Sequence, residues 1–207
     1  MAASRSKNGS GKAPTARPRR NTQFVPPATI TLPQMLSSGS DMSFRESLYL
    51  MFQAFGRLQS FRDAFGKALS LTASQFIVLI GTANRQGNEG VSIRALADHT
   101  QLAATHVTTE VGRLTAKGLL SKSANERDRR GVLVRLTPKG EAAIVAINPL
   151  LRRVNDRLFQ NVSREDFATV SRFLSTFALN SEDALAEVRR AERERTAREP
   201  WPRNVSK

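Results

Sequence analysis

The feature that most constrains this chain is a run of two short helical segments followed by two alternating ones. Apolar residues over 93–99 and 104–117 have helical spacing, and Thr100-Gln101-Leu102 between them has the composition of a turn. Residues 119–123 and 132–136 then alternate as strands do, with a polar loop between them. Two helices joined by a short turn form a helix-turn-helix unit, and the hairpin that follows predicts a wing beside its second helix.

The charges on this segment favour a nucleic-acid partner. The loop of the hairpin carries Arg127, Arg129 and Arg130 around Asp128. An arginine-tipped hairpin suits the narrow, electronegative minor groove of DNA, whereas a helix fits the major groove, where base edges present distinct donors and acceptors. The alternative is a solvated basic hairpin on an unrelated fold. Its place directly after a helix-turn-helix favours double-stranded DNA as the partner.

The second helix of the unit carries small or hydrogen-bonding side chains on the face opposite to its apolar stripe. We expect this face to contact the edges of base pairs. The predicted contacts are Ala104, Thr105, His106, Thr108, Thr109 and Arg113. For His106 the alternative is an exposed helix residue with no special role.

The composition agrees with a polyanionic partner. The chain has 207 residues, with 32 Lys and Arg against 18 Asp and Glu, for a net charge of +14. Residues 1–40 hold six of the basic residues and no acidic one, so the remainder is basic in its own right. There is no cysteine, and the only histidines are His99 and His106, which argues against a disulfide framework and a metal site. We predict no cofactor.

Other classes of protein are disfavoured by what the sequence lacks. There is no nucleophile elbow, phosphate loop or metal-ligand cluster, so we do not predict an enzyme. No apolar run is long enough to span a bilayer, and the N-terminus lacks the apolar core of a secretory signal. We therefore expect a cytoplasmic, nucleoid-associated protein with no membrane partner.

The predicted fold is mainly α with a small antiparallel β wing, a winged helix-turn-helix with N- and C-terminal dimerisation helices. Residues 1–40 are expected to be a disordered basic arm, residues 71–137 the DNA-binding domain and residues 196–207 a flexible tail. Residues 41–70 and 138–195 are expected to form a helical dimerisation region, because their apolar stripes exceed what one thin domain covers.

Helix starts are marked by capping residues. Thr72 can cap a helix over 73–84, Thr137-Pro138 opens another, and Ser163 opens the last. Ser92 belongs either to a short strand or to the cap of the next helix. Pro149 interrupts a helical stripe and predicts a bend there.

The motifs over residues 71–140 resemble those of the MarR family of bacterial transcriptional regulators. The matching pieces are Leu71-Thr72 with Gln75-Phe76, Leu96-Ala97, Val107-Thr108, Leu114 with Lys117-Gly118-Leu119, Asp128-Arg129-Arg130 and Leu136-Thr137-Pro138-Lys139-Gly140. The resemblance covers residues 42–190. It implies a homodimer that places two recognition helices in successive major grooves of a near-palindromic operator. It also implies that Asp128 braces the wing, that Arg130 enters the minor groove, and that Arg127 and Arg129 serve the backbone or the groove.

The resemblance further implies repression that a small ligand relieves by binding between the dimerisation helices and the DNA-binding lobe. The predicted ligand contacts are Leu48, Phe52, Phe55, Phe76 and Leu79, for which core packing is the alternative. An aromatic acid, a phenolic compound or an acyl-CoA thioester would be compatible. The alternative function is an architectural DNA-binding protein without sequence preference and without a ligand.

Three residues depart from the family pattern. Ala103 stands where the family often has a serine that caps the recognition helix. Glu110 stands where an apolar residue is usual, and it either pairs with an arginine or repels phosphate. Gly112 loosens the helix by up to about 1 kcal/mol relative to alanine.

Overall fold

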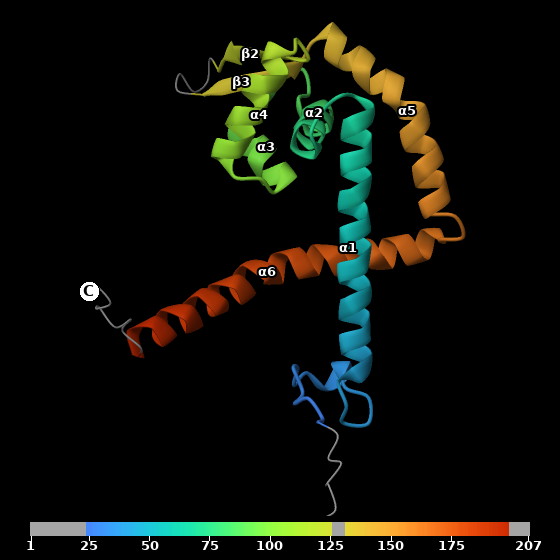
Figure 1. Ribbon diagram of the computed structural model, residues 1–207, viewed down its shortest axis with the longest axis vertical. Coiled ribbons are helices and arrows are strands. Elements are labelled where there is room, and N and C mark those ends of the chain that lie inside the picture. Colours follow the sequence, from blue (N-terminus) through green and yellow to red (C-terminus); the bar gives the residue numbers. More distant parts are fainter. Residues whose placement is uncertain (1–23, 126–130, 199–207) are drawn as a thin grey trace, which may run out of the picture. The chain divides into compact units, whose positions relative to one another are not determined.

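The computed structural model describes residues 24–125 and 131–198 (Figure 1). The helices are α1 (Met42–Ala68), α2 (Ala73–Arg85), α3 (Ile93–Thr100), α4 (Ala104–Ala116), α5 (Pro138–Leu158) and α6 (Arg164–Arg198), and a 3-10 turn, η1, covers Pro33–Met35. The strands are β1 (Val91–Ser92), β2 (Leu120–Ala124) and β3 (Val132–Leu136). This is the predicted mainly helical fold with a small antiparallel sheet. The chain divides into two compact units, residues 1–58 and 59–207.

The sheet closes one side of a helical lobe in the second unit. Its strand order is β1-β3-β2, and both pairings are antiparallel, with Val91 opposite Val134 and Leu120 opposite Leu136. Helices α2, α3 and α4 pack on one another and on this sheet (Figure 1). Their shared core consists of Leu71, Val78, Leu79, Val91, Leu96, Ala97, Val107, Val111, Leu114, Leu119, Leu120 and Val134. The helix-turn-helix and the wing strands are therefore confirmed.

Side-chain caps fix where the helices of this lobe begin. Thr72 and Gln75 form a capping box at the start of α2, each side chain bonding the other's backbone N–H. Ser92 has both of the roles that the sequence allowed. It is the last residue of β1, and its hydroxyl caps α3 by accepting a hydrogen bond from the N–H of Ala95. Gln101 then ends α3 in the left-handed conformation (φ 56°), which turns the chain towards α4.

The start of α5 is fastened to the junction between α4 and β2. The Thr137 N–H donates to the Leu119 carbonyl (3.1 Å), and the Thr137 hydroxyl donates to the Gly118 carbonyl (2.6 Å). Lys139 Nζ adds a bond of 2.8 Å to the Lys117 carbonyl. Gly140 comes so close to Leu119 that a side chain there would not fit. The Thr-Pro-Lys-Gly motif thus bonds the start of α5 to the segment that joins α4 to the wing.

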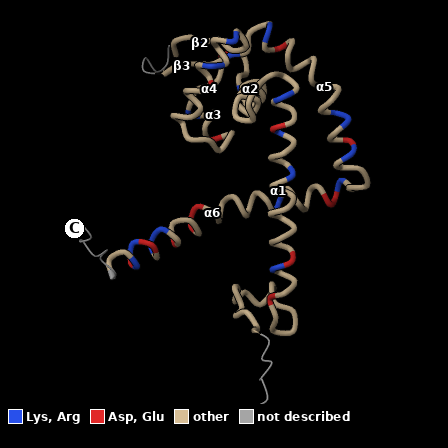
Figure 2. Tube along the Cα trace, in the orientation of Figure 1, with Lys and Arg blue, Asp and Glu red and all other residues tan. Residues whose placement is uncertain are grey.

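Long stretches of α6 and α1 carry no charge. Residues 173–181 of α6 and residues 47–56 of α1 contain no Lys, Arg, Asp or Glu (Figure 2). No residue of α6 with a described side chain is buried. Its exposed large apolar side chains are Phe167, Val170, Phe173, Leu174, Phe177, Leu179, Leu185 and Val188. In α1, the exposed ones are Met42, Tyr49, Leu50, Phe52, Phe55 and Leu58.

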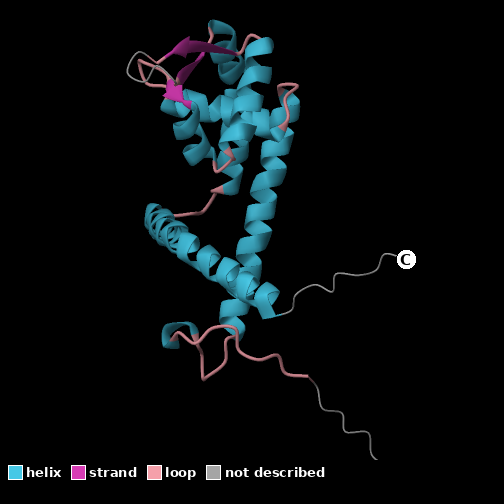
Figure 3. Ribbon diagram, turned by 90° about the vertical axis from the view of Figure 1, so that its left-hand side faces the viewer, coloured by secondary structure: helices cyan, strands magenta, loops and turns pink. Residues whose placement is uncertain are grey.

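The N-terminal segment corrects one expectation. Residues 24–40 were expected to belong to a disordered arm, but they hold η1 and a bridge between Ser37 and Ser40 (Figure 3). The carboxylate of Asp41 accepts bonds from the backbone N–H (2.7 Å) and the hydroxyl (2.9 Å) of Thr29 and forms an ion pair with Arg45 (3.0 Å). Arg45 also donates to the Pro27 carbonyl. This clamp ties residues 27–29 to the start of α1, whereas residues 1–23 lie outside the described residues.

Among the described helices, none alone is long and apolar enough to cross a bilayer. Only α1 and α2 taken together reach that length and composition, across a bend of 87°.

Gly140→Ala is expected to destabilise the protein by about 3 kcal/mol, because the added Cβ would lie 2.1 Å from the Leu119 carbonyl oxygen. The matched control is Gly112→Ala, also in a helix, where the added Cβ finds no atom within 4 Å and stability should rise by up to about 1 kcal/mol. Urea denaturation measures both changes. Equal effects of the two substitutions would contradict this account of Gly140.

The Asp41 clamp should open in acid. The pKa of Asp41 is lowered from 3.8 to about 2 by the hydrogen bond from the Thr29 N–H, and further by Arg45 and the Thr29 hydroxyl. Because the folded pKa lies below the unfolded one, the clamp contributes stability above about pH 4 and loses it as the pH falls towards 2. The carboxyl carbon shift of Asp41, followed by NMR, should titrate near pH 2. A midpoint near 4 would show that the clamp is absent in solution.

Candidate nucleic-acid interface

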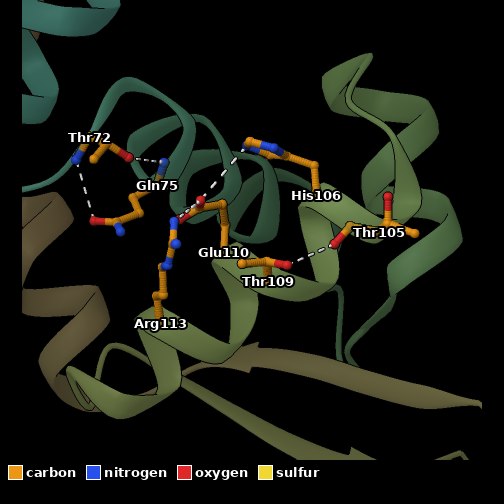
Figure 4. A network of polar contacts seen from close by, with 7 residues as sticks. All are labelled: Thr72, Gln75, Thr105, His106, Thr109, Glu110 and Arg113. Carbon is orange, nitrogen blue, oxygen red and sulfur yellow. Dashed lines mark hydrogen bonds and ion pairs between the residues drawn. The ribbon is translucent and has the colours of Figure 1, made fainter.

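Helix α4 is held by one face and exposes the other. Val107, Val111 and Leu114 are fully buried against the core of the lobe. Because a helix turns once every 3.6 residues, this packing directs Thr105 and Thr109 away from the core, and both are exposed (Figure 4). Ala104, His106, Thr108 and Arg113, the other predicted contacts on this helix, are exposed as well. The six residues therefore share one solvent-facing surface.

The threonine hydroxyls on this surface are oriented by the helix itself. Thr108 donates to the Ala104 carbonyl (2.8 Å), and Thr109 donates to the Thr105 carbonyl (3.1 Å). Each hydroxyl proton is used within the helix, which leaves the oxygen as an acceptor and the methyl group free for apolar contact. In the major groove such a side chain suits the amino group of adenine or cytosine, or the methyl group of thymine.

Gly112 opens the surface further. It lies one turn after Thr108 and Thr109 on the outward side of α4, and nothing in the lobe lies within 4 Å of where its Cβ would be. Packing therefore does not require a glycine at this position. The missing side chain instead allows another molecule to approach the helix backbone. The sequence marked Gly112 only as a weak point of the helix, because a glycine's exposure is visible only once the helix is packed.

The structure also shows the surroundings of Ala103 and Glu110, the other two residues that depart from the family pattern. Ala103 is the N-cap of α4 and gives no side-chain bond, so the first N–H groups of the helix lack that partner. Glu110 is 3 % exposed and forms an ion pair with Arg113 through Oε1 (2.7 Å) (Figure 4). His106 Nε2 lies 3.8 Å from the same oxygen. Of the two alternatives for Glu110, the arginine pair is confirmed.

The wing is described up to the base of its loop. Strands β2 and β3 pair from Leu120 opposite Leu136 to Ala124 opposite Val132, and Lys122 is exposed on β2. The loop contacts predicted from the sequence, Arg127, Asp128, Arg129 and Arg130, lie outside the described residues and stay predictions. Lys122 was not predicted, because alternation alone does not tell which face of an edge strand meets a partner.

The predicted ligand contacts are divided between the two units. Leu48, Phe52 and Phe55 belong to the first unit, where Phe52 and Phe55 are exposed. In the second unit, Leu79 is fully buried in the core of the lobe. Phe76 packs with Phe65, with ring centroids 5.8 Å apart, and with Ile147. Within the second unit, Leu79 and Phe76 thus belong to separate apolar clusters, and the predicted five-residue ligand site stays a prediction.

One cavity of about 280 Å³ does reach Phe76. It is lined by Arg62, Phe76, Ile77, Ile80, Gly81, Asn84, His99 and Thr100. The Nδ1 atom of His99 accepts a hydrogen bond from Arg85 Nε (3.1 Å). The lining thus combines apolar residues with four polar ones, Arg62, Asn84, His99 and Thr100.

Comparisons with known proteins agree with this geometry. A family model described as a winged helix DNA-binding domain matches residues 71–140. The HTH-type transcriptional regulator YdcH of Bacillus subtilis (strain 168), itself uncharacterised, is 30% identical over 122 residues, which cover 57% of this chain and 81% of YdcH.

Solved structures give the same fold. A MarR-family regulator from Silicibacter pomeroyi aligns with a TM-score of 0.57 at 22% identity, over 73% of this chain and 96% of its own. BpsR of Bordetella bronchiseptica, whose DNA binding is regulated by 6-hydroxynicotinic acid, aligns with a TM-score of 0.50 at 25% identity, over 64% and 98%. The relative and the family model make this chain a member of the HTH-type transcriptional regulators with a winged helix DNA-binding domain, and its fold is that of MarR-family structures.

Proposed function

We propose that this regulator is a repressor that binds a near-palindromic operator as a homodimer and releases it when a small effector binds. The observation that carries the proposal is the exposed face of α4, which is turned outward by the burial of Val107, Val111 and Leu114. The proposed contacts on it are Ala104, Thr105, His106, Thr108, Thr109 and Arg113. The wing adds Arg127, Arg129 and Arg130 for the minor groove and the DNA backbone, with Asp128 bracing them.

The uncharged stretches of α1 and α6 support the proposal of a homodimer. Residues 47–56 and 173–181 carry large exposed apolar side chains and no charge. Such stretches are rarely left to solvent, because apolar surface of this size is stabilised by burial. We assign them to contacts with a second copy of the chain, in the region predicted from residues 41–70 and 138–195. Two copies related by a twofold axis would place their α4 helices about 10 base pairs apart.

The cavity beside Phe76 supports a small, anionic effector. Its apolar walls suit a ring, and Arg62 supplies a cation that pairs with a carboxylate. A volume of about 280 Å³ accommodates a one-ring acid and is too small for an acyl-CoA thioester. The regulation of BpsR by 6-hydroxynicotinic acid is a precedent for a ligand of this kind. Among the compatible ligands, the cavity favours the aromatic acid.

Selection of duplexes from a random pool tests the operator proposal. The wild-type dimer should enrich a near-palindrome and bind it about a thousandfold more tightly than a scrambled duplex at the same salt concentration.

Gly112→Ala should weaken the affinity for the selected duplex about tenfold, because the added methyl group stands between α4 and the groove, although it stabilises the free protein. Arg130→Ala should weaken binding and lower the slope of log affinity against log salt by about one. If no sequence is enriched, the architectural alternative holds.

Release of the selected duplex by benzoate, salicylate or 6-hydroxynicotinate tests the effector site. At least one of these acids should dissociate the complex, and Arg62→Gln should raise the concentration needed by about tenfold, because the carboxylate loses its cation. Arg57→Gln, a change on the same helix that leaves the cavity's lining intact, serves as the control. Equal sensitivity of the Arg62→Gln and Arg57→Gln variants would place the effector elsewhere.

A further inference from the structure

The packing face of α4 contains one residue that packing does not explain. Glu110 lies in the same buried stripe as Val107, Val111 and Leu114 and is 3 % exposed. Its Oε1 atom has Arg113 at 2.7 Å and His106 at 3.8 Å. Its Oε2 atom is buried, with no hydrogen-bond partner among the described residues. The carboxylate is thus taken out of water with only one of its oxygens compensated.

Such an arrangement costs folding free energy. A buried carboxylate loses its hydration, and a single ion pair with a half-exposed arginine recovers only part of it. A leucine at this position would extend the apolar stripe and leave no oxygen unpaired. A residue that breaks the local packing rule without a structural return points to function.

The partners of Glu110 indicate what that function is. Arg113 and His106 stand on either side of Glu110 along α4 and border the surface that carries Thr105 and Thr109 (Figure 4). Arg113 is exposed along most of its side chain, yet its Nη1 atom is held by the buried carboxylate. An unpaired arginine beside DNA moves between rotamers and binds whichever phosphate is near. A held guanidinium keeps its remaining donors in one orientation, as recognition of guanine O6 and N7 requires.

We propose that Glu110 is a positioning residue for sequence recognition, which holds Arg113 on the reading surface of α4 and keeps it from binding phosphate indiscriminately. The inference rests on the operator recognition proposed above. It predicts that Glu110 contributes to the discrimination between DNA sequences more than to affinity for DNA in general. Its negative charge also opposes the attraction of α4 to any backbone phosphate.

The test measures the affinity of the full chain for two duplexes of equal length, one selected by the wild-type protein and one with the same composition scrambled. Glu110→Gln keeps the shape of the side chain and removes its charge, and Glu110→Leu fills the stripe with an apolar group. Asp98→Asn is the charge-matched control, because Asp98 is an exposed acidic residue on α3 of the same lobe and lies outside the proposed DNA contacts. NMR of the Arg113 side chain reports whether its guanidinium is still held.

Both Glu110 variants should lower the ratio of the two affinities about tenfold, mainly by binding the scrambled duplex more tightly, with a salt slope steeper by about one. The Arg113 guanidinium signal should show free rotation in both. Glu110→Leu should melt at or above the wild-type temperature, and Asp98→Asn should leave the ratio unchanged. In an Arg113→Ala background, Glu110→Gln should have no further effect on the ratio.

Three results overturn the inference. The first is an unchanged ratio in Glu110→Gln, and the second is an equal loss with and without Arg113. The third is a Glu110→Leu variant that unfolds or melts well below the wild type, which would give the carboxylate a structural role. If the wild-type chain selects no sequence at all, the proposed operator recognition fails first. If it selects one and the Glu110 variants keep the ratio, only the role of Glu110 is wrong.

Discussion

The rest of the structure depends on the contact between α4 and the core of the winged lobe. Val107, Val111 and Leu114 are fully buried, and each contributes about 1.5–3 kcal/mol through the loss of apolar surface from water. More important for function, three points along one stripe fix the rotation of the helix about its axis. That rotation decides that Thr105 and Thr109 face outward and that Glu110 does not. Core packing therefore determines which face of α4 is free for the DNA contacts that we propose.

Features governed by local rules could be predicted from the sequence. The stripe of α4 and the caps at Thr72 and Thr137 depend on residues within a few positions of one another, and the paired strands of the wing are consecutive segments of one hairpin. Helical spacing names the exposed face of α4 without any knowledge of its neighbours.

Features that depend on distant partners could not be predicted. Thr29 and Asp41 are 12 residues apart. The composition of a Ser- and Pro-rich segment does not indicate that one of its threonines will form a hydrogen bond with a carboxylate at the start of a helix. The sequence could place Glu110 near an arginine but not show that one oxygen is buried without a partner. In the same way, the stripe of α2 did not reveal that Leu79 is covered by the lobe's own core while Phe76 borders a cavity.

Helix α5 is bonded to the lobe at its first turn and interrupted by a proline in its middle. Thr137 and Lys139 bind the first turn of α5 to three consecutive carbonyls, those of Lys117, Gly118 and Leu119, so this turn is bonded directly to the DNA-binding lobe. Farther along, Pro149 lies inside α5 and has no N–H for the carbonyl of Val145. The first half of α5 is therefore bonded to the lobe at one end, and at its other end it lacks a hydrogen bond that an uninterrupted helix would have.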